Sequence, residues 1–174
     1  GWGIFKDYWL TGTGPSTYEL LFPVYLGKEA PGLVECVGLC LNPPHSHNIF
    51  VQIATDTGVI GLGLFMVFLI TVYSRGIYLL RNTPPETRNF VFFLILSVTG
   101  FMIHNQIEYN WNQTYFLYPF IFLVFGMDFL DRKYSSRKSS VNKINSLIHS
   151  GVLTAFVLLG TLSTMNYYKY QSLI

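Results

Sequence analysis

Four apolar stretches run through the last two-thirds of the chain and predict helices that cross a membrane. They cover residues 58–74, 90–107, 115–130 and 147–166. A membrane-spanning helix needs about 20 predominantly apolar residues, and the tyrosines and tryptophans beside the shorter stretches complete them as interfacial belts. The pattern therefore predicts an all-α fold, a polytopic transmembrane helical bundle of about four spans.

The first 57 residues follow a different pattern and are predicted to form an external loop. Residues 1–45 are rich in Gly, Pro and Tyr without a sustained period, which is typical of irregular structure. Helical spacing begins near His47. It places Ile49, Phe50, Ile53 and Ala54 on one face, opposite Gln52, Thr55 and Asp56. This favours a short amphipathic helix that lies on the membrane surface.

The composition indicates a membrane protein and argues against nucleic-acid binding. Hydrophobic residues make up 51% of the 174 residues and charged residues only 11%, whereas soluble domains carry about 25% charged residues. The formal net charge is only +2, and the sequence has no basic stripe with interleaved aromatics. Because no signal-peptide pattern follows Gly1, we expect the chain to be the C-terminal portion of a longer multi-pass protein.

The basic residues predict the orientation of the spans. Eight of the eleven Lys and Arg follow the first or the third span: Arg75, Arg81, Arg88, Arg132, Lys133, Arg137, Lys138 and Lys143. Short loops rich in Lys and Arg stay in the cytoplasm. The segment 1–57, the turn 105–114 and the C-terminus are therefore expected outside the cytoplasm.

His47 is the candidate for acid–base chemistry. The preceding Pro-Pro pair stops any earlier helix, Ser46 is predicted to be the N-cap, and His47 then falls in the first helical turn. The positive end of the helix dipole disfavours an imidazolium there, and a neutral ring is the form that a general base requires. The alternative is an interfacial histidine with ordinary hydrogen bonds.

Three passages of the chain form a set of motifs with a defined order and spacing. The most specific is His47-Asn48, followed after nine residues by Gly58-Val59-Ile60-Gly61, whose glycines let the chain bend and pack closely at the membrane. Upstream lies Gly12-Thr13-Gly14-Pro15, and downstream the stretch 100–111 ends in Glu108-Tyr109-Asn110-Trp111. Together these passages, within residues 1–130, resemble the O-antigen ligase and O-antigen polymerase superfamily.

The resemblance implies a glycosyltransferase at the outer face of the bacterial inner (plasma) membrane. Such enzymes move a glycan from undecaprenyl diphosphate to an acceptor hydroxyl: on the lipid A-core in ligases, on another repeat unit in polymerases, and on a protein side chain in a third branch. His47 matches the catalytic base of the ligases, which invert the sugar centre without a metal or cofactor. Asn48, His45 and Glu108 are then expected to bind substrate.

The chain departs from the family pattern in its arginines. In the family, arginines neutralise the departing diphosphate, which suits the fork geometry of guanidinium. The outer segments of this chain contain only Lys6, Lys28 and Lys169, and no Arg. We therefore expect the diphosphate clamp elsewhere in the protein and expect the chain alone to be inactive.

Several groups have a second interpretation that the sequence leaves open. Glu108, with the polar residues at 104–106, either forms a rim that holds a sugar or marks a helix end that meets water. Asp128 and Arg132, at helical spacing, predict an interfacial ion pair. Cys36 and Cys40 are either bonded to each other or two small apolar residues.

The sequence is also compatible with one other chemistry and two other functions. A metal site made of His45, His47 and one of the two cysteines lacks the usual ligand spacings, so no metal is expected. A solute transporter of the same superfamily is a second function, although transporter-like members lack a His at the motif position. A non-catalytic membrane scaffold is a third, and it leaves the motif spacing unexplained.

Overall fold

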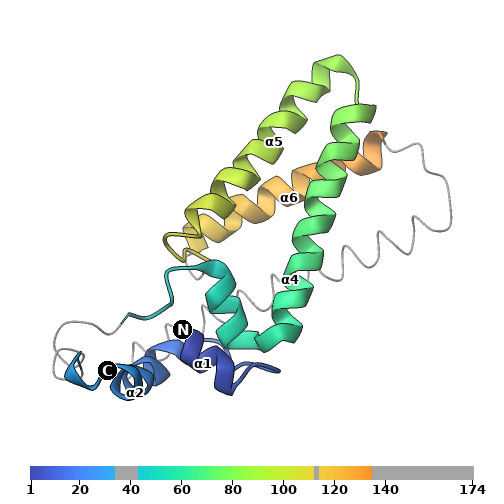
Figure 1. Cartoon of the computed structure of the whole chain (residues 1–174). Coiled ribbons are helices and arrows are strands. Elements are labelled where there is room, and N and C mark those ends of the chain that lie inside the picture. Colours follow the sequence, from blue (N-terminus) through green and yellow to red (C-terminus); the bar gives the residue numbers. More distant parts are fainter. Residues whose placement is uncertain (34–42, 112–113, 135–174) are drawn as a thin grey trace. The chain divides into compact units, whose positions relative to one another are not determined.

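The structure is a computed structural model that describes residues 1–33, 43–111 and 114–134, and every regular element in these ranges is a helix (Figure 1). In chain order the elements are α1 (Trp2–Asp7), α2 (Tyr18–Glu29), the 3₁₀-helix η1 (Pro31–Leu33), α4 (Ile49–Asn82), α5 (Pro85–His104) and α6 (Thr114–Tyr134). They belong to two compact units. Among the described residues the first unit comprises 1–33, 43–64 and 104–109, and the second comprises 65–103, 110–111 and 114–134, so α4 contributes to both. The predicted all-α class is confirmed for the described residues.

The first unit begins with two helices where the sequence predicted an irregular loop. Ile4 of α1 and Tyr18 of α2 are buried, and the Tyr25 hydroxyl donates a hydrogen bond to Asp7 Oδ2 at 2.6 Å. The sequence concealed α2 because Pro23 lies inside it and its apolar residues do not gather on one face. The loop prediction is wrong for these two segments.

α4 is interrupted at Gly58, as the sequence predicted. The backbone there (φ 66°, ψ −166°) is not helical and lies in a region that essentially only glycine adopts. The N–H of Val59 has lost its helical acceptor and donates instead to Trp9 O at 2.7 Å. A Cβ at position 58 would overlap the backbone of Leu10. The break therefore requires glycine for both conformation and space.

The stretch Gly12-Thr13-Gly14 forms the other half of this contact. Thr13 and Gly14 donate their N–H groups to Thr55 O and Asp56 O, each at 2.9 Å. These carbonyls lie in the last turn before the break, where a helix leaves its acceptors unpaired. A Cβ on Gly12, whose φ is +70°, would overlap the backbone of Asp56. The glycines thus let two backbones meet, which gives this motif a structural role.

The part of α4 before the break buries the polar face that the prediction turned outward, together with Ile49 and Ala54 of the predicted apolar face. Gln52, Thr55 and Asp56 are buried, with 2%, 0% and 8% of their surface exposed, whereas Phe50 and Ile53 are only partly covered. Gln52 Nε2 donates to Asp56 Oδ1 at 3.0 Å, and Thr55 Oγ1 donates to Gln52 O at 2.9 Å. Paired polar groups can be buried at little cost. The prediction of a surface helix with an outward polar face is therefore wrong.

The second unit contains α4 from Phe65 onward, α5 as far as Ile103, and α6. Aromatic rings fill its interior. Phe120 of α6 stacks on Phe101 with ring centroids 4.6 Å apart, and its ring lies 5.2 Å from that of Trp111 and 6.3 Å from that of Phe68. Offset and edge-on aromatic pairs of this kind stabilise a core beyond the area that they bury.

An ionic cluster lies in the same unit. Arg132 Nε donates to Asp128 Oδ2 at 2.7 Å, which confirms the predicted i,i+4 ion pair. Arg75 of α4 also pairs with Asp131 and lies 3.9 Å from Asp128 Oδ1. The predicted first span ended before Arg75, whereas the helix continues past it to Asn82. Arg75 is therefore a packed helix residue and not a loop cation.

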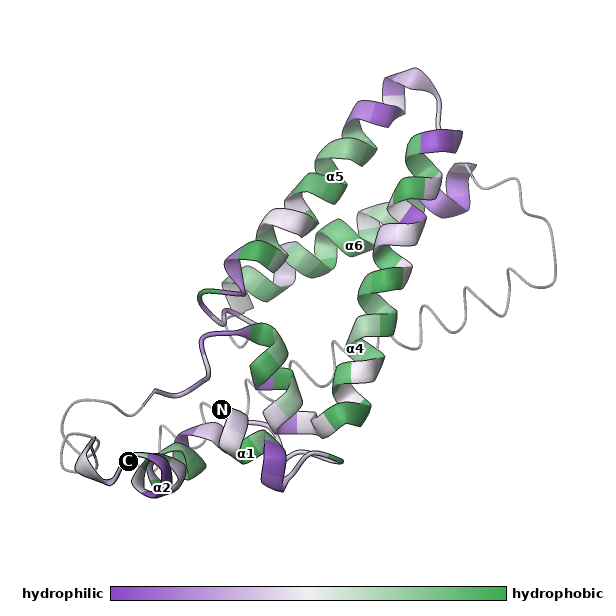
Figure 2. Ribbon diagram, viewed as in Figure 1, coloured by the Kyte–Doolittle hydropathy of each residue, from purple (hydrophilic) through white to green (hydrophobic). Residues whose placement is uncertain are grey.

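α4 and α5 are both long and apolar enough to cross a membrane. In the most apolar segment of each helix, only 39% of α4 and 22% of α5 is buried inside the protein. A core helix of a soluble protein is mostly covered. Large apolar side chains such as Val67, Ile70, Phe93 and Leu96 are exposed. Figure 2 shows hydrophobic ribbon along both helices and hydrophilic residues at the turn that joins them. These features indicate association with a membrane.

The structure does not confirm the third and fourth predicted spans as membrane-spanning helices. α6 forms a helix over the third predicted span but is not one of the two helices in the described part of the chain that are long and apolar enough to cross a membrane. The fourth predicted span, 147–166, lies outside the described residues, as do Cys36 and Cys40. The four-span bundle therefore stays a prediction.

Candidate functional site

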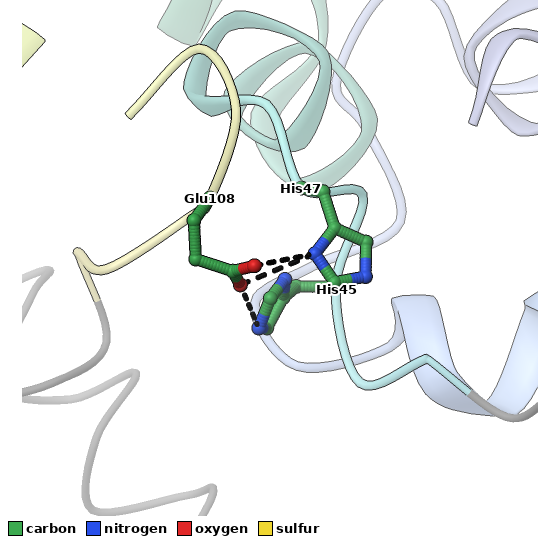
Figure 3. A group of neighbouring side chains, drawn as sticks. All are labelled: His45, His47 and Glu108. Atoms are coloured by element: carbon green, nitrogen blue, oxygen red, sulfur yellow. Dashed lines mark hydrogen bonds and ion pairs between the residues drawn. The ribbon is translucent and has the colours of Figure 1, made fainter. Parts of the chain in front are cut away.

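Three titratable side chains meet in the first unit (Figure 3). The Nδ1 atom of His47 lies 3.1 and 3.0 Å from the two carboxylate oxygens of Glu108. The Nε2 atom of His45 lies 3.5 Å from Glu108 Oε1. The two imidazole rings meet edge to face, with centroids 4.7 Å apart. We call His45, His47 and Glu108 the His–His–Glu cluster.

Asn48 sets the position of the histidines by capping α4, which begins at the next residue. Its Oδ1 accepts hydrogen bonds from the N–H groups of Phe50 and Val51, at 3.0 and 3.2 Å, as an N-cap side chain does. The predicted cap, Ser46, instead donates from Oγ to Asn48 O at 2.9 Å. His47 consequently precedes the helix and does not belong to its first turn, so the helix-dipole reason for a neutral ring does not apply.

His47 has an unusual backbone conformation. Its φ is +55°, in the left-handed region, where a residue with a Cβ is uncommon although histidine is enriched among those that occur. Its side chain is 52% exposed. A strained residue with an exposed functional group is a feature that gathers at active sites.

Glu108 reaches the cluster because the chain after α5 folds back onto the start of α4. Ile49 donates its N–H to Asn105 O at 2.8 Å. Asn48 Nδ2 lies 3.2 Å from both the backbone oxygen and Oε1 of Gln106. These bonds tie residues 104–109 to the segment that carries both histidines, although Glu108 and His47 are 61 positions apart in sequence.

His45 is the buried member of the cluster, with only 9% of its surface exposed. Burial lowers the pKa of His45, and the neighbouring His47 lowers it further, against a smaller raising effect of Glu108. Its ring centroid lies 5.5 Å from that of Tyr109, whose phenol pKa is raised by its own burial and by Asp56. Both rings are therefore neutral groups near physiological pH.

The geometry at His47 fixes which ring nitrogen is available for chemistry. An ionised carboxylate only accepts hydrogen bonds, so in the neutral ring Nδ1 carries the proton toward Glu108. Nε2 then has a free lone pair, and it points away from the carboxylate (Figure 3). A histidine oriented by a carboxylate in this way is the arrangement of a general base.

The structure thus brings three of the four predicted site residues into direct contact, and the fourth, Asn48, joins the segment of the histidines to Gln106 through hydrogen bonds. The Asn48 amide is engaged within the protein at both ends, which gives it a positioning role; contact with substrate stays a prediction. Sequence reasoning missed Gln52, whose Oε1 accepts the Ser46 N–H at 2.8 Å. The i,i+4 spacing of Gln52 and Asp56 was the signal that could have revealed it.

Comparison with protein-family models, with curated proteins and with solved structures found no match to this chain.

Proposed function

We propose that this chain carries the catalytic base of an O-antigen ligase-like membrane glycosyltransferase. The observation that carries the proposal is the pair of hydrogen-bond distances between His47 Nδ1 and the Glu108 carboxylate. The side chain is exposed, and its Nε2 has no hydrogen bond to any of the residues that the structure describes. The reaction class rests on the resemblance of His47-Asn48 and the following Gly58-Val59-Ile60-Gly61 to that superfamily. The O-antigen or exopolysaccharide polymerases are the alternative within the same chemistry.

In the proposed step, His47 Nε2 takes the proton of an acceptor hydroxyl. The hydroxyl oxygen forms a bond to the anomeric carbon of the lipid-linked glycan on the face opposite the leaving group. The bond from that carbon to the diphosphate oxygen breaks, and undecaprenyl diphosphate leaves with the electron pair. Glu108 holds the reactive tautomer and stabilises the imidazolium that forms. The step takes place at the outer face of the bacterial inner membrane.

Replacement of His47 by Ala tests the proposal in full-length protein. Loss of a general base lowers the rate by about 10²- to 10⁴-fold, so surface-polysaccharide transfer should fall to background while the amount of protein in the membrane is unchanged. Glu108→Gln keeps a side chain of the same shape without the charge, and it should lower transfer less than His47→Ala. Normal polymer on cells that carry His47→Ala would reject the catalytic role.

A transporter is the second candidate function, and one observation favours it. α4 is broken at Gly58, and a buried carboxylate, Asp56, lies just before the break. Interrupted helices with polar groups near the break form the binding sites of many transporters. The same His47→Ala variant separates the two functions, because flux through a pathway at Asp56 does not need the exposed imidazole.

A further inference from the structure

The His–His–Glu cluster has a second chemical capacity, which its donor atoms reveal. Each residue offers one ligand atom, and the three atoms lie within 4.8 Å of one another. In a tetrahedral zinc site with bonds of about 2.1 Å, neighbouring donors lie about 3.4 Å apart. The distances from Glu108 oxygens to His47 Nδ1 and His45 Nε2, 3.0 and 3.5 Å, already match that spacing.

The set of donors selects a class of ion. Two imidazoles and one carboxylate suit Zn²⁺ and similar divalent transition metals, whereas Mg²⁺ and Ca²⁺ prefer sites made of oxygen alone. A metal binds an imidazole through the lone pair of its neutral form, and the Glu108 carboxylate supplies a negatively charged ligand for the cation. The exposed His47 and Glu108 side chains, 52% and 44% exposed, leave a fourth position open to water, as in zinc sites with three protein ligands.

The tautomer of His45 decides whether its Nε2 can bind an ion. Its Nδ1 is buried and has no hydrogen-bond partner among the described residues. The Nε2 atom faces the Glu108 carboxylate, which favours the ring proton on Nε2. Binding of an ion through Nε2 therefore requires that proton to move to Nδ1, after which Nε2 presents its lone pair to an ion beside Glu108. The bonds from Asn48 and Ile49 to residues 104–109 hold Glu108 near both rings, which lowers the entropic cost of gathering the ligands.

We propose that His45 Nε2, His47 Nδ1 and the Glu108 carboxylate form a binding site for a divalent transition-metal ion of the Zn²⁺ type, with water as the fourth ligand. The chain segment 43–48 and the turn 104–109 supply all three protein ligands. The site lies entirely within the first unit.

Metal binding has a consequence for the base, and this consequence rests on the proposed function. A metal on Nδ1 takes the lone pair that a neutral ring has there, so the ring proton must move to Nε2. The metal also draws the Glu108 carboxylate away from its hydrogen bond with His47. The metal-bound cluster therefore has no basic nitrogen for an acceptor hydroxyl, and Zn²⁺ should inhibit transfer reversibly.

The binding test uses full-length protein purified in detergent, freed of metal with a chelator, and titrated with Zn²⁺ and with Co²⁺. We expect the protein to bind one equivalent of either ion at the His–His–Glu cluster. Bound Co²⁺ should show the visible absorption of a tetrahedral site. His45→Asn and His47→Asn should each weaken binding by at least about tenfold. The matched control is His104→Asn, which removes an exposed histidine outside the cluster and should bind as the wild type does.

Each outcome decides one proposal. Equal metal affinity for wild type, His45→Asn and His47→Asn would overturn the metal site and leave the base untouched. Cluster-dependent binding without inhibition of transfer, or inhibition that the chelator does not reverse, would overturn the assignment of His47 as the base and leave the metal site standing. Because His47 is exposed, its Asn variant keeps the test valid if the buried His45→Asn variant fails to fold.

Discussion

His47 is held in its left-handed conformation by groups on both sides of it. A residue with a Cβ in that region costs about 1–2 kcal/mol, and such strain persists only where the surroundings enforce it. Here Ser46 and Asn48 fix the backbone on either side, and Glu108 holds the ring. The strained position coincides with the proposed base, and under the proposed function this conformation would present Nε2 to the acceptor.

At this same scale, Asn48 should contribute to stability through both ends of its amide. Asn48→Ala removes the N-cap, which typically costs about 1 kcal/mol, and the bonds to Gln106, each worth about 0.5–1.5 kcal/mol. Asn48→Asp keeps the oxygen that accepts from Phe50 and Val51 but loses the donor to Gln106. Thermal unfolding in detergent should rank the wild type first, Asp second and Ala last.

A different ranking would carry a clear meaning. If Asp is no more stable than Ala, the cap does not stabilise this helix. If Asn48→Ala unfolds with the wild type, the residue has no positioning role, and its predicted contact with substrate becomes the better account of the motif.

Part of the site was accessible from the sequence, and part was not. His47 stood out because an ionisable residue beside an apolar span is costly and needs a reason. For Glu108 the sequence left two interpretations open, a sugar-binding group or a helix end in water. Its contact with His47 depends on a return of the chain across 61 positions. No period or spacing in a single sequence encodes that return, which hydrogen bonds from Asn48 and Ile49 establish.

At the scale of elements, the break in α4 is the feature that most constrains the sequence. Gly58→Ala would force a Cβ into the backbone of Leu10 at a φ of +66° and should cost at least about 2 kcal/mol, given the strain typical of such conformations. Gly63→Ala is the matched control, because an added Cβ there meets nothing within 4 Å and alanine favours a helix by about 1 kcal/mol.

The measurement is the unfolding temperature of both variants in the same detergent. We expect Gly58→Ala to fall and Gly63→Ala to stay level or rise. If the two variants behave alike, the contact between the glycine break and the stretch Gly12-Thr13-Gly14 is not a determinant of the fold.

The accuracy of the element predictions follows from what each signal measures. Long apolar runs predicted the positions of α4, α5 and α6, because a long continuous apolar segment forms few structures other than a helix. The polar face of the first part of α4 was misplaced because Gln52 and Asp56 satisfy each other inside the protein, and hydropathy does not register paired burial. α1 and α2 were missed because Gly and Pro in 1–33 mimic the composition of a loop.

At the scale of the whole molecule, the apolar exterior of α4 and α5 sets the environment in which the site works. Water cannot cover exposed side chains such as Val67, Ile70 and Phe93 without a large free-energy cost, at about 25 cal/mol per Å² of apolar area. A bilayer can cover them. The proposed chemistry fits that setting, because a donor with a polyprenyl tail and a base on an exposed loop can meet only at a membrane surface.

The last prediction concerns the orientation of α4 and α5 in the membrane. The structure shows which arginines near the α4–α5 turn are free to determine that orientation. Arg75 is paired with Asp131, so the exposed Arg81 and Arg88 beside the α4–α5 turn should carry most of the signal that keeps this turn in the cytoplasm. Reporter fusions after Asn82 should therefore report cytoplasm, and fusions after Tyr109 should report the outer side.

The variants test which charges determine this orientation. Replacing Arg81 and Arg88 together by Ala should produce mixed insertion, whereas Arg75→Ala alone should leave the orientation unchanged. A cytoplasmic reporter after Tyr109 in the wild type would place His47 and Glu108 on the side away from the proposed lipid-linked donor, and the transferase proposal would then fail regardless of the geometry of the cluster.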